Sequence, residues 1–523
     1  MRGIGTIQIP TGDVFGNIWA LTWVSRHLLT PGRLFAANLY YPDPASLAST
    51  ESLLAESLVA APLLALGVSP VGSYNVVWLI TYPLSGLGAY LLARHLSGSA
   101  AGAFLAGLAF AFSAYRLESA VHIQTLSIQW LPFAVLFLLR ALDSPTVSNL
   151  VGCGAFVLLQ ALSSGYYAAL LAPVLGVTLL FHARAAGSRA LLRVAAALVL
   201  SAVVAVPAFL PYWRAQQRLD LARPKRDLVA WSAAWYSYFR PSGQALFPTL
   251  WPLRRLVREG PALYPGTAVV ALAAAAVAAR RRSTPFLLAL LATGALLSFG
   301  PEIQVGSLTL PGPYEAIRHL PGYRLLRTPS RMAPAALLAF AVLAALGWAA
   351  LAERSAAFRR FGFLLIVLAA GEGAVVRATP PFAPMPLAPP GVRWLAAAPR
   401  GPVLELPWAT YDGRAAYASI THGQRMVNGW GAFAPPASIR LGIWGARWPG
   451  RGAARVLRGA GVRYVLVHVD RLPAHQQTRV LDTATLPKGV VLAAQLGDDR
   501  IYTISPDGPT GPAIDEPIPP DAP

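Results

Sequence analysis

Apolar segments of membrane-spanning length recur along the chain and are separated by short connections that contain arginine. A spanning helix needs about 20 mostly apolar residues. Clear candidates lie at 73–93, 147–164, 165–182, 191–211 and 332–351. Weaker candidates lie at 99–113, 125–142, 262–279, 284–299 and 361–376. Because backbone polar groups inside a bilayer must hydrogen-bond within their own segment, the pattern predicts a polytopic α-helical membrane domain of about ten spans over residues 73–376.

The composition points to the same class of protein. The chain of 523 residues is 55% hydrophobic and 13% charged, with a mean hydropathy of +0.50, whereas a typical soluble domain is about 25% charged. Even a large soluble domain leaves much surface that needs polar cover. The only cysteine, Cys153, lies inside an apolar segment, which excludes a disulfide-based scaffold.

The positions of arginine predict which side of the membrane each connection occupies. The formal net charge is +20. The basic connections contain Arg94, Arg140, residues 184–193, residues 280–282 and residues 354–360. Alternating spans put these connections on one side, which the positive-inside rule assigns to the cytoplasm. The outer side then receives residues 1–72, the connections 212–261 and 300–331, and the chain after residue 377. An external segment at 1–72 leads us to expect a further transmembrane helix before residue 1.

The pattern changes after residue 377, where a proline-rich linker at 377–392 leads into alternating segments. VLELP at 403 and VRYVLVHVD at 462 alternate as strands do, and VVLAAQLGDDRIYTIS is typical of a hairpin. We therefore expect a small external α/β domain at 393–504. The remaining segment, 505–523, is too rich in proline and polar residues to fold.

An acidic residue, Asp13, precedes an amphipathic stretch in TGDVFGNIWALTW. Trp19 and Trp23 in this stretch suit a membrane interface. Asp13 is either the N-cap of a helix, accepting hydrogen bonds from backbone N–H groups, or a carboxylate at the outer membrane face that deprotonates an acceptor hydroxyl. The two roles are compatible.

Two further carboxylates, Glu51 and Glu56, lie beside or within an apolar segment. Together with Asp13 they could act as a general base or bind a divalent cation, although nothing in the sequence requires a cofactor. The alternative is a short interfacial helix at 51–67 whose acidic side chains face water.

Polar residues of the external connection after residue 113 are candidates for binding substrate. Arg116 could bind a phosphate, and His122 and Gln124 could hydrogen-bond an oxygen of a sugar or a phosphate. A histidine at a helix end can equally be structural.

Four arginines, Arg318, Arg324, Arg327 and Arg331, come just before the span at 332–351. They lie on the side where positive charge is disfavoured next to spans. The planar fork of arginine matches phosphate geometry, so this cluster could hold a phosphodiester or pyrophosphate. The alternative is contact with lipid headgroups in a chain that is rich in arginine throughout.

Several motifs of other enzyme classes are absent from the sequence. It contains no Walker-type loop, no GxGxxG after a strand, no HExxH and no CxxC, which removes support for ATP-driven, dinucleotide-dependent and zinc-hydrolase functions. The basic charge is spread around apolar segments without a nucleic-acid motif, so we expect no nucleic-acid partner.

Four stretches of the chain together resemble a known family. They are TGDVFGNIWALTW, ANLYYPDPASLASTES, AFAFSAYRLESAVHIQ and YRLLRTPSRMAPAALLAFAVLAALG. They resemble bacterial members of the GT-C superfamily, polytopic glycosyltransferases that use polyprenyl-phosphate-linked sugars on the extracytoplasmic side. The resemblance covers roughly residues 10–380. ELPW, HGQRMVNGW and GVRYVLVHVD resemble the external domain that is often attached to this branch.

The resemblance implies a reaction and assigns Asp13 the position of the family's catalytic carboxylate. An acceptor hydroxyl activated by Asp13 would attack the anomeric carbon of a lipid-phosphate sugar, with inversion, and external arginines would stabilise the leaving phosphate. The implied enzyme is a hexosyl or pentosyl transferase of the cell membrane. Its implied partners are the polyprenyl-phosphate donor, a glycan, lipid or protein acceptor, and membrane lipids.

Two other function classes remain open from the sequence. One is a transporter or flippase for an envelope lipid, in which the same arginines line a headgroup path. A transporter is expected to show repeated halves and charged or broken helices near the bilayer midplane, and the sequence shows no clear internal repeat. The other is a non-catalytic assembly protein that uses the external domain to bind a partner.

Overall fold

The computed structural model describes residues 3–244, 260–374, 381–482, 484 and 486–507. Parts of the expected connection 212–261, span 361–376 and linker 377–392, and the expected tail from residue 508, lie outside these residues. The contacts divide the chain into two compact units. The α/β unit comprises residues 1–75, 211–219 and 382–523, and the helical unit comprises residues 76–210 and 220–381.

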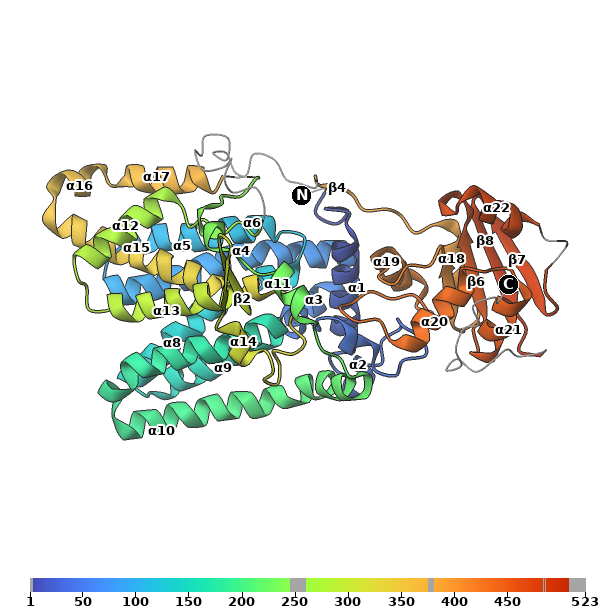
Figure 1. Cartoon of the computed structure of the whole chain (residues 1–523), viewed down its shortest axis with the longest axis horizontal. Helices are drawn as coiled ribbons and strands as arrows, with labels where there is room; N and C mark the ends of the chain where they lie inside the picture. The colour runs from blue at the N-terminus through green and yellow to red at the C-terminus, as the bar shows by residue number, and fades with distance from the viewer. Residues whose placement is uncertain (1–2, 245–259, 375–380, 483, 485, 508–523) are drawn as a thin grey trace. The chain divides into compact units, whose positions relative to one another are not determined.

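The helical unit is a bundle of apolar helices (Figure 1). Its long helices are α4 (Pro70–Ser97), α5 (Ala100–Ala111), α8 (Leu131–Asp143), α9 (Val147–Ser163), α10 (Gly165–Leu219), α12 (Thr267–Ala278), α13 (Thr284–Ser298), α15 (Pro334–Arg354) and α17 (Phe363–Glu372). Two of these helices are divided between the units: residues 70–75 of α4 and Pro211–Leu219 of α10 are assigned to the α/β unit. Among the described residues, every predicted span contains helix, and the predicted fold class, a polytopic α-helical membrane protein with a small C-terminal α/β domain, is confirmed.

Short elements occupy the connections between these helices. They are α6 (Ala114–Glu118), α7 (Ile123–Leu126), α11 (Lys225–Ala230), η2 (Trp235–Phe239), α14 (Tyr314–Ile317), η4 (Pro329–Met332) and α16 (Ala356–Phe361). Strands β2 (Glu302–Val305) and β3 (Leu308–Pro311) form an antiparallel hairpin in the connection before α15.

Helix α10 contains two of the predicted spans, 165–182 and 191–211. Gly187 has φ 74° and ψ 157°, outside the helical region, and so bends α10 between the predicted spans 165–182 and 191–211. Of the described helices, five are long and apolar enough to cross a membrane, and others are shorter apolar helices. The predicted spans thus contain described helices, but several of these helices are shorter than a membrane span.

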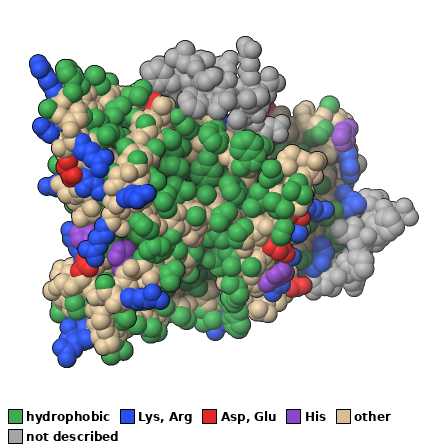
Figure 2. All heavy atoms as spheres, turned by 60° about the vertical axis from the view of Figure 1, so that its left-hand side comes forward, with side chains coloured by type: hydrophobic (Ala, Val, Ile, Leu, Met, Phe, Trp, Pro, Cys, Tyr) green, Lys and Arg blue, Asp and Glu red, His purple; other side chains and the backbone are tan. Residues whose placement is uncertain are grey.

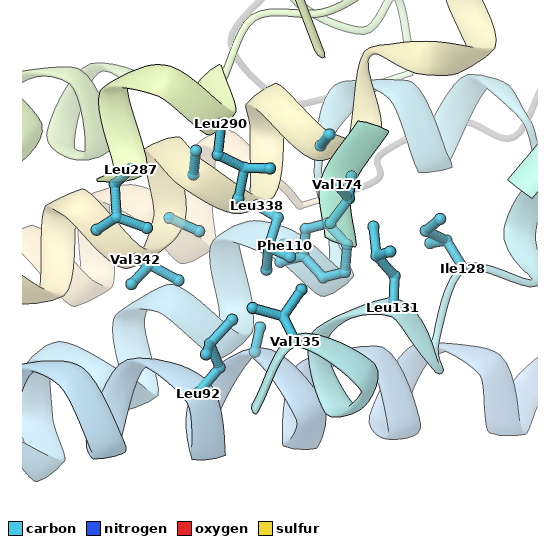
Figure 3. Packing of buried hydrophobic residues seen from close by; sticks show 14 of the residues in the cluster. Leu92, Phe110, Ile128, Leu131, Val135, Val174, Leu287, Leu290, Leu338 and Val342 are labelled. Carbon is cyan, nitrogen blue, oxygen red and sulfur yellow. The ribbon is translucent and has the colours of Figure 1, made fainter. Parts of the chain in front are cut away.

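The core of the helical unit lies where α15 contacts its neighbours α5, α12 and α13. Figure 3 shows Leu338 and Val342 of α15 among Phe110 of α5 and aliphatic side chains from α4, α8 and α13. The alternation of small and large residues in PAALLAFAVLAALG lets these helices approach closely, as apolar helices do in membranes. Nearly all of α15 is buried.

The outer surface of the helical unit is apolar rather than polar. Leu180, Leu192 and Val147 are 74%, 73% and 78% exposed, which suits contact with lipid. Figure 2 shows a broad apolar face with basic side chains gathered along its left-hand edge. Within this unit, the bend of α10, the connection between α12 and α13, and α16 lie at the same end of the bundle (Figure 1), as expected for basic connections on one side of a membrane.

The C-terminal part of the chain forms the predicted α/β fold around a four-stranded sheet. Its strands are β5 (Val403–Leu406), β6 (Tyr464–His468), β7 (Val490–Leu496) and β8 (Asp499–Ile504), in the order β5-β6-β8-β7. Strands β5 and β6 are parallel, with Val403 opposite Tyr464, and β7 and β8 form the predicted hairpin. The surrounding helices are α18 (Pro390–Ala397), α19 (Gly413–His422), α20 (Pro436–Gly445), α21 (Arg451–Gly459), η5 (Val469–Arg471) and α22 (Ala474–Leu481).

The N-terminal segment is built into the same unit. It contains β1 (Ile7–Gln8), α1 (Gly12–His27), α2 (Pro31–Leu34), η1 (Ser46–Ser49) and α3 (Leu54–Ala65). Strand β1 pairs with β4 (Ala383–Pro384). The backbone N–H groups of Tyr40 and Tyr41 donate to the carbonyls of Asn428 and Met426, at 3.1 and 2.7 Å. The sequence treats 1–72 and 393–504 as separate domains, whereas these backbone bonds join them.

A buried charge network holds the sheet together. His468 at the end of β6 contacts Asp499 Oδ1 through Nδ1 at 2.6 Å and Glu405 Oε1 through Nε2 at 2.8 Å, and His468 is 2% exposed. Asp499 Oδ2 accepts the backbone N–H of Gly391 at 2.7 Å. Burial alone would lower the pKa of His468, but the two carboxylates outweigh burial and raise this pKa to about 9. The imidazolium therefore links β5, β6, β8 and the start of α18 at neutral pH.

The network predicts a pH-dependent stability of the α/β unit. Protonated His468 contributes stability that is fully present below its unfolded pKa of 6.5 and is lost as the pH rises through its folded pKa of about 9. His468→Gln leaves two buried carboxylates without their cation, which we expect to cost about 3–5 kcal/mol. Hydrogen exchange of the amides of β6 and β8, followed by mass spectrometry on the full chain in detergent, measures both effects. An exchange profile that depends on pH equally in His468→Gln and in the parent chain would contradict this assignment.

Candidate functional site

Asp13 stands in the first turn of α1, which begins at Gly12. The N-cap of α1 is Thr11, whose side chain accepts the backbone N–H of Val14 at 3.5 Å. The interpretation of Asp13 as the N-cap is therefore wrong, because the chain becomes helical one residue before it. Asp13 is half-buried, and a carboxylate in the first turn interacts favourably with the helix dipole. The helix after Asp13 is buried from Val14 to Thr22, so the position of this carboxylate is fixed.

The carboxylates Glu51 and Glu56 belong to the same α/β unit. Glu56 lies in the first turn of α3 and is 2% exposed, and α3 packs against α1. The interpretation of 51–67 as an interfacial helix whose acidic side chains face water is wrong for Glu56, because α3 turns this side chain into the unit. Glu51 is half-buried. Among the described residues, no group of three or more His, Cys, Asp or Glu side chains is arranged to hold a metal ion.

Two residues in the last turns of α10, which the sequence did not single out, contact the segment around Glu51. The hydroxyl of Tyr212 donates to the carbonyl of Thr50 at 2.8 Å, next to Glu51. Arg218 donates to Asp43 Oδ2 at 2.7 Å. These contacts join residues about 170 positions apart in the chain, and no local pattern in the sequence marks them.

In the helical unit, Arg116 is almost completely enclosed, at 1% exposed. Its Nε and one terminal nitrogen donate to the carbonyls of Ala111 and Leu126, at 2.9 and 2.5 Å, and the other terminal nitrogen donates to Thr81 Oγ1 at 3.2 Å. The guanidinium lies 4.8 Å from the centre of the Tyr82 ring. Since each of its three nitrogens donates to a backbone or hydroxyl oxygen of the protein, this arrangement favours a structural role over phosphate binding.

The two other polar candidates of this connection differ in exposure. His122 precedes α7 and is half-buried, and its carbonyl accepts the hydroxyl of Thr125 at 2.7 Å. Gln124 is 7% exposed, and its Oε1 accepts no hydrogen bond within the described structure. Neither residue contacts Arg116 through a hydrogen bond that the described structure shows.

The arginines before α15 separate into two groups. Arg318 Nε is 2.8 Å from Glu315 Oε1, an ion pair within one turn. Glu315 and Glu302 also face Lys225, whose Nζ is 2.8 Å from Glu302. The charge of Arg318 is thus balanced by acidic neighbours. Arg324 is exposed, and its carbonyl accepts the backbone N–H of Arg223 at 3.1 Å.

Arg327 and Arg331 converge on one aromatic residue, Tyr166, at the start of α10. The backbone N–H of Arg327 donates to the Tyr166 hydroxyl at 3.1 Å, and the Arg331 guanidinium lies 4.4 Å from the centre of the Tyr166 ring. The Arg327 guanidinium lies 4.9 Å from the centre of the Trp231 ring. Cation–π contacts hold a guanidinium by its face, so the ring does not use the N–H donors of the guanidinium. Tyr166 was missed by sequence reasoning because it looks like an ordinary residue of an apolar span.

The structure therefore groups the candidates by unit. Asp13, Glu51 and Glu56 belong to the α/β unit, and the candidate arginines with His122 and Gln124 belong to the helical unit. Arg327 and Arg331 are brought together on Tyr166, whereas Arg318 is engaged by Glu315. A single site that combines Asp13 with the arginines stays a prediction.

No protein-family model and no curated protein matches this chain. Solved structures do match it. The arabinofuranosyltransferase AftD from Mycobacteria aligns with a TM-score of 0.61 at 17% identity, covering 96% of this chain and 38% of AftD. A variant of the same protein aligns with a TM-score of 0.63 at 17% identity, covering 95% and 40%. ArnT from Cupriavidus metallidurans bound to undecaprenyl phosphate aligns with a TM-score of 0.46 at 13% identity, covering 94% and 99%.

The similarity to AftD extends over both units of this chain, and the chain spans about two fifths of the length of AftD. At 17% identity, this structural similarity is evidence for the fold alone. The resemblance carried by the GD, YYPDP and TPSRM stretches predicts the same architecture. Over both of its units, the chain therefore shares the fold of AftD.

Proposed function

We propose that this chain is a membrane glycosyltransferase that transfers a hexose or pentose from a polyprenyl-phosphate donor to an acceptor hydroxyl on the extracytoplasmic face. The observation that carries the proposal is the pair Arg327 and Arg331, which lie beside the first turn of α15 and contact Tyr166 through a backbone N–H and through a guanidinium group, respectively. Two guanidinium groups at the end of an apolar helix suit an anion that is attached to a lipid, because they meet the phosphate where the hydrocarbon ends.

Helix lengths support a position of these arginines at one membrane face. Tyr166 starts α10, and the bend at Gly187 lies 21 residues further along, which corresponds to about 32 Å of helix. This length is close to the hydrocarbon thickness of a bilayer, about 30 Å. The connection at the bend carries Arg184, Arg189 and Arg193. The positive-inside rule assigns that bend to the cytoplasm and therefore assigns Arg327 and Arg331 to the outside, as we propose for the C-terminal domain as well.

In the proposed reaction, the Asp13 carboxylate accepts the proton of the acceptor hydroxyl. The oxygen attacks the anomeric carbon of the donor, and the bond from that carbon to the phosphate oxygen breaks with its electron pair leaving on the phosphate. Arg327 and Arg331 stabilise the charge that develops there. A single displacement of this kind inverts the configuration at the anomeric carbon. The burial of α1 supports the role of Asp13, because a fixed carboxylate needs no reorganisation during the reaction.

The role of Asp13 predicts the effect of a substitution that keeps its size. Asp13→Asn removes the proton acceptor, and we expect turnover to fall by about 10²–10⁴-fold. The measurement is sugar transfer by the full chain in nanodiscs, with a panel of undecaprenyl-phosphate sugars as donors and cell-envelope glycans, lipids and proteins as acceptors. Asp498→Asn is the matched control, because Asp498 is an exposed carboxylate in the turn between β7 and β8. Transfer that survives in Asp13→Asn would remove the catalytic assignment, and lipid translocation without transfer would favour the transporter alternative.

The role of the arginines predicts a defect in donor binding. Each of Arg327→Gln and Arg331→Gln deletes charged hydrogen bonds to the phosphate, which are worth about 1.5–3 kcal/mol, so we expect the donor KM to rise about tenfold or more per substitution. Binding of undecaprenyl phosphate to the full chain measures the effect without requiring the donor sugar. Arg282→Gln, an exposed arginine of the connection between α12 and α13, is the control. Equal affinity of the parent chain and both variants for undecaprenyl phosphate would exclude this phosphate site.

A further inference from the structure

The first residue of α19 lies directly against the residue that precedes Asp13. A Cβ atom placed on Gly413, the first residue of α19, would lie 2.0 Å from the carbonyl oxygen of Gly12 and 3.0 Å from its Cα. Only a glycine at 413 permits this approach, since real side chains do not come closer than about 3 Å. The start of α19 and the start of α1 are therefore in contact, although 400 residues separate them in the sequence.

One turn further along, α1 and α19 are also in contact through aromatic side chains. The rings of Phe15 and Tyr417 have centroids 5.4 Å apart, and the Arg414 guanidinium lies 5.9 Å from the centre of the Phe15 ring. A Cβ on Gly16 would fall 2.0 Å from the indole of Trp430. These contacts hold α1 against the C-terminal residues of the α/β unit on the side next to Asp13.

The loop that this contact brings to Asp13 has an exposed aromatic ring between polar groups. Tyr411 is 55% exposed, and Arg414 three residues later is exposed as well. Asp412 is half-buried, and its Oδ1 accepts the backbone N–H of Ala415 at 2.9 Å. Burial and the charge of Glu405 raise the pKa of Asp412 to about 6. Tyr411 and Asp412 before α19 and Arg414 in its first turn thus place an aromatic ring, a carboxyl group and a guanidinium within four residues.

These groups match the chemistry of a carbohydrate. A pyranose or furanose has a face of C–H groups, which packs on an aromatic ring. It also has hydroxyl groups around its edge, which hydrogen-bond to guanidinium and carboxylate groups. A binding site of this composition has an apolar wall with a few polar groups that set orientation. A phospholipid surface would instead favour several cations with apolar anchors, and a peptide strand would favour a free sheet edge.

We propose that Tyr411, Asp412 and Arg414 form the acceptor subsite next to Asp13 and that the acceptor is a saccharide. Tyr411 supports one face of the acceptor sugar, and Arg414 and Asp412 bind its hydroxyls, so that another hydroxyl is presented to the Asp13 carboxylate. The inference deepens the proposed function and rests on it for the role of Asp13. The contact of Gly413 with Gly12 sets the distance between the subsite and this carboxylate.

Binding of saccharides to the full chain in nanodiscs tests the subsite without the donor. The probes are short linear arabinan and mannan oligosaccharides, observed by saturation-transfer NMR. We expect at least one of these saccharides to bind, and Tyr411→Ala to weaken its binding by roughly tenfold, the upper range for the loss of an aromatic contact. Phe382→Ala is the matched control, because Phe382 is another exposed aromatic residue of the same unit, at 47%, and should leave binding unchanged.

The outcomes separate the subsite from the proposed function. Saccharide binding that depends on Tyr411 in a chain whose transfer tolerates Asp13→Asn would support the subsite and contradict the catalytic role of Asp13. No binding of any probe, or binding that Tyr411→Ala leaves unchanged, would overturn the subsite. Binding of phosphatidylglycerol vesicles or of an unstructured peptide that Tyr411→Ala abolishes, without saccharide binding, would also overturn it.

A second variant tests the placement of the subsite. Gly413→Ala forces the start of α19 away from Gly12, so we expect a fall in turnover of roughly tenfold or more with saccharide affinity retained, because small misplacements of reacting groups are costly. Gly32→Ala is the control, since a Cβ at Gly32 meets nothing within 4 Å. Equal turnover in Gly413→Ala and Gly32→Ala would contradict the proposed placement.

Discussion

The close packing of α1 inside the α/β unit is the constraint on which the rest of this unit depends. Its residues from Val14 to Thr22 are buried, and it is held between α3 and α19. A single carbon atom added at Gly16 or at Gly413 would lie 2.0 Å from a neighbouring atom. Such an interior transmits small displacements rather than absorbing them. The position of the start of α1, which carries Asp13, is consequently set by residues 413–430 of the unit as well as by the helix itself.

In the helical unit, aromatic rings organise the positive charge. Arg116 lies over Tyr82, Arg327 over Trp231 and Arg331 over Tyr166, but the outcomes differ. The N–H groups of Arg116 donate to protein oxygens inside the unit, whereas Arg327 is exposed. Arginine in this apolar bundle therefore serves two purposes. Arg116 donates hydrogen bonds to backbone carbonyls of a connection, and Arg327 places a positive charge at the surface.

Hydropathy and strand alternation were sufficient to predict the spans and the C-terminal sheet, because both patterns are local. The candidates Asp13 and Arg331 could be named because a carboxylate and several arginines next to apolar segments are costly and conspicuous. The partners of these residues could not be named. Tyr166 meets Arg327 across 161 positions, and His468 meets Glu405 across 63 positions. The burial of Glu56 and the acceptors to which Arg116 donates also depend on tertiary packing, which no spacing in the sequence predicts.

The backbone pairing of Tyr40 and Tyr41 with residues 426–428 has a consequence for the order of assembly. Synthesis runs from the N-terminus, so the segment around Asp13 is made long before the strands and helices that enclose it. All the helices of the helical unit are made in between. Contacts this distant in sequence form late, because the intervening chain must be ordered first. The carboxylate of Asp13 is therefore synthesised before the residues that enclose it, and it reaches its final surroundings only when the C-terminal sheet has folded, which keeps the start of α1 open until then.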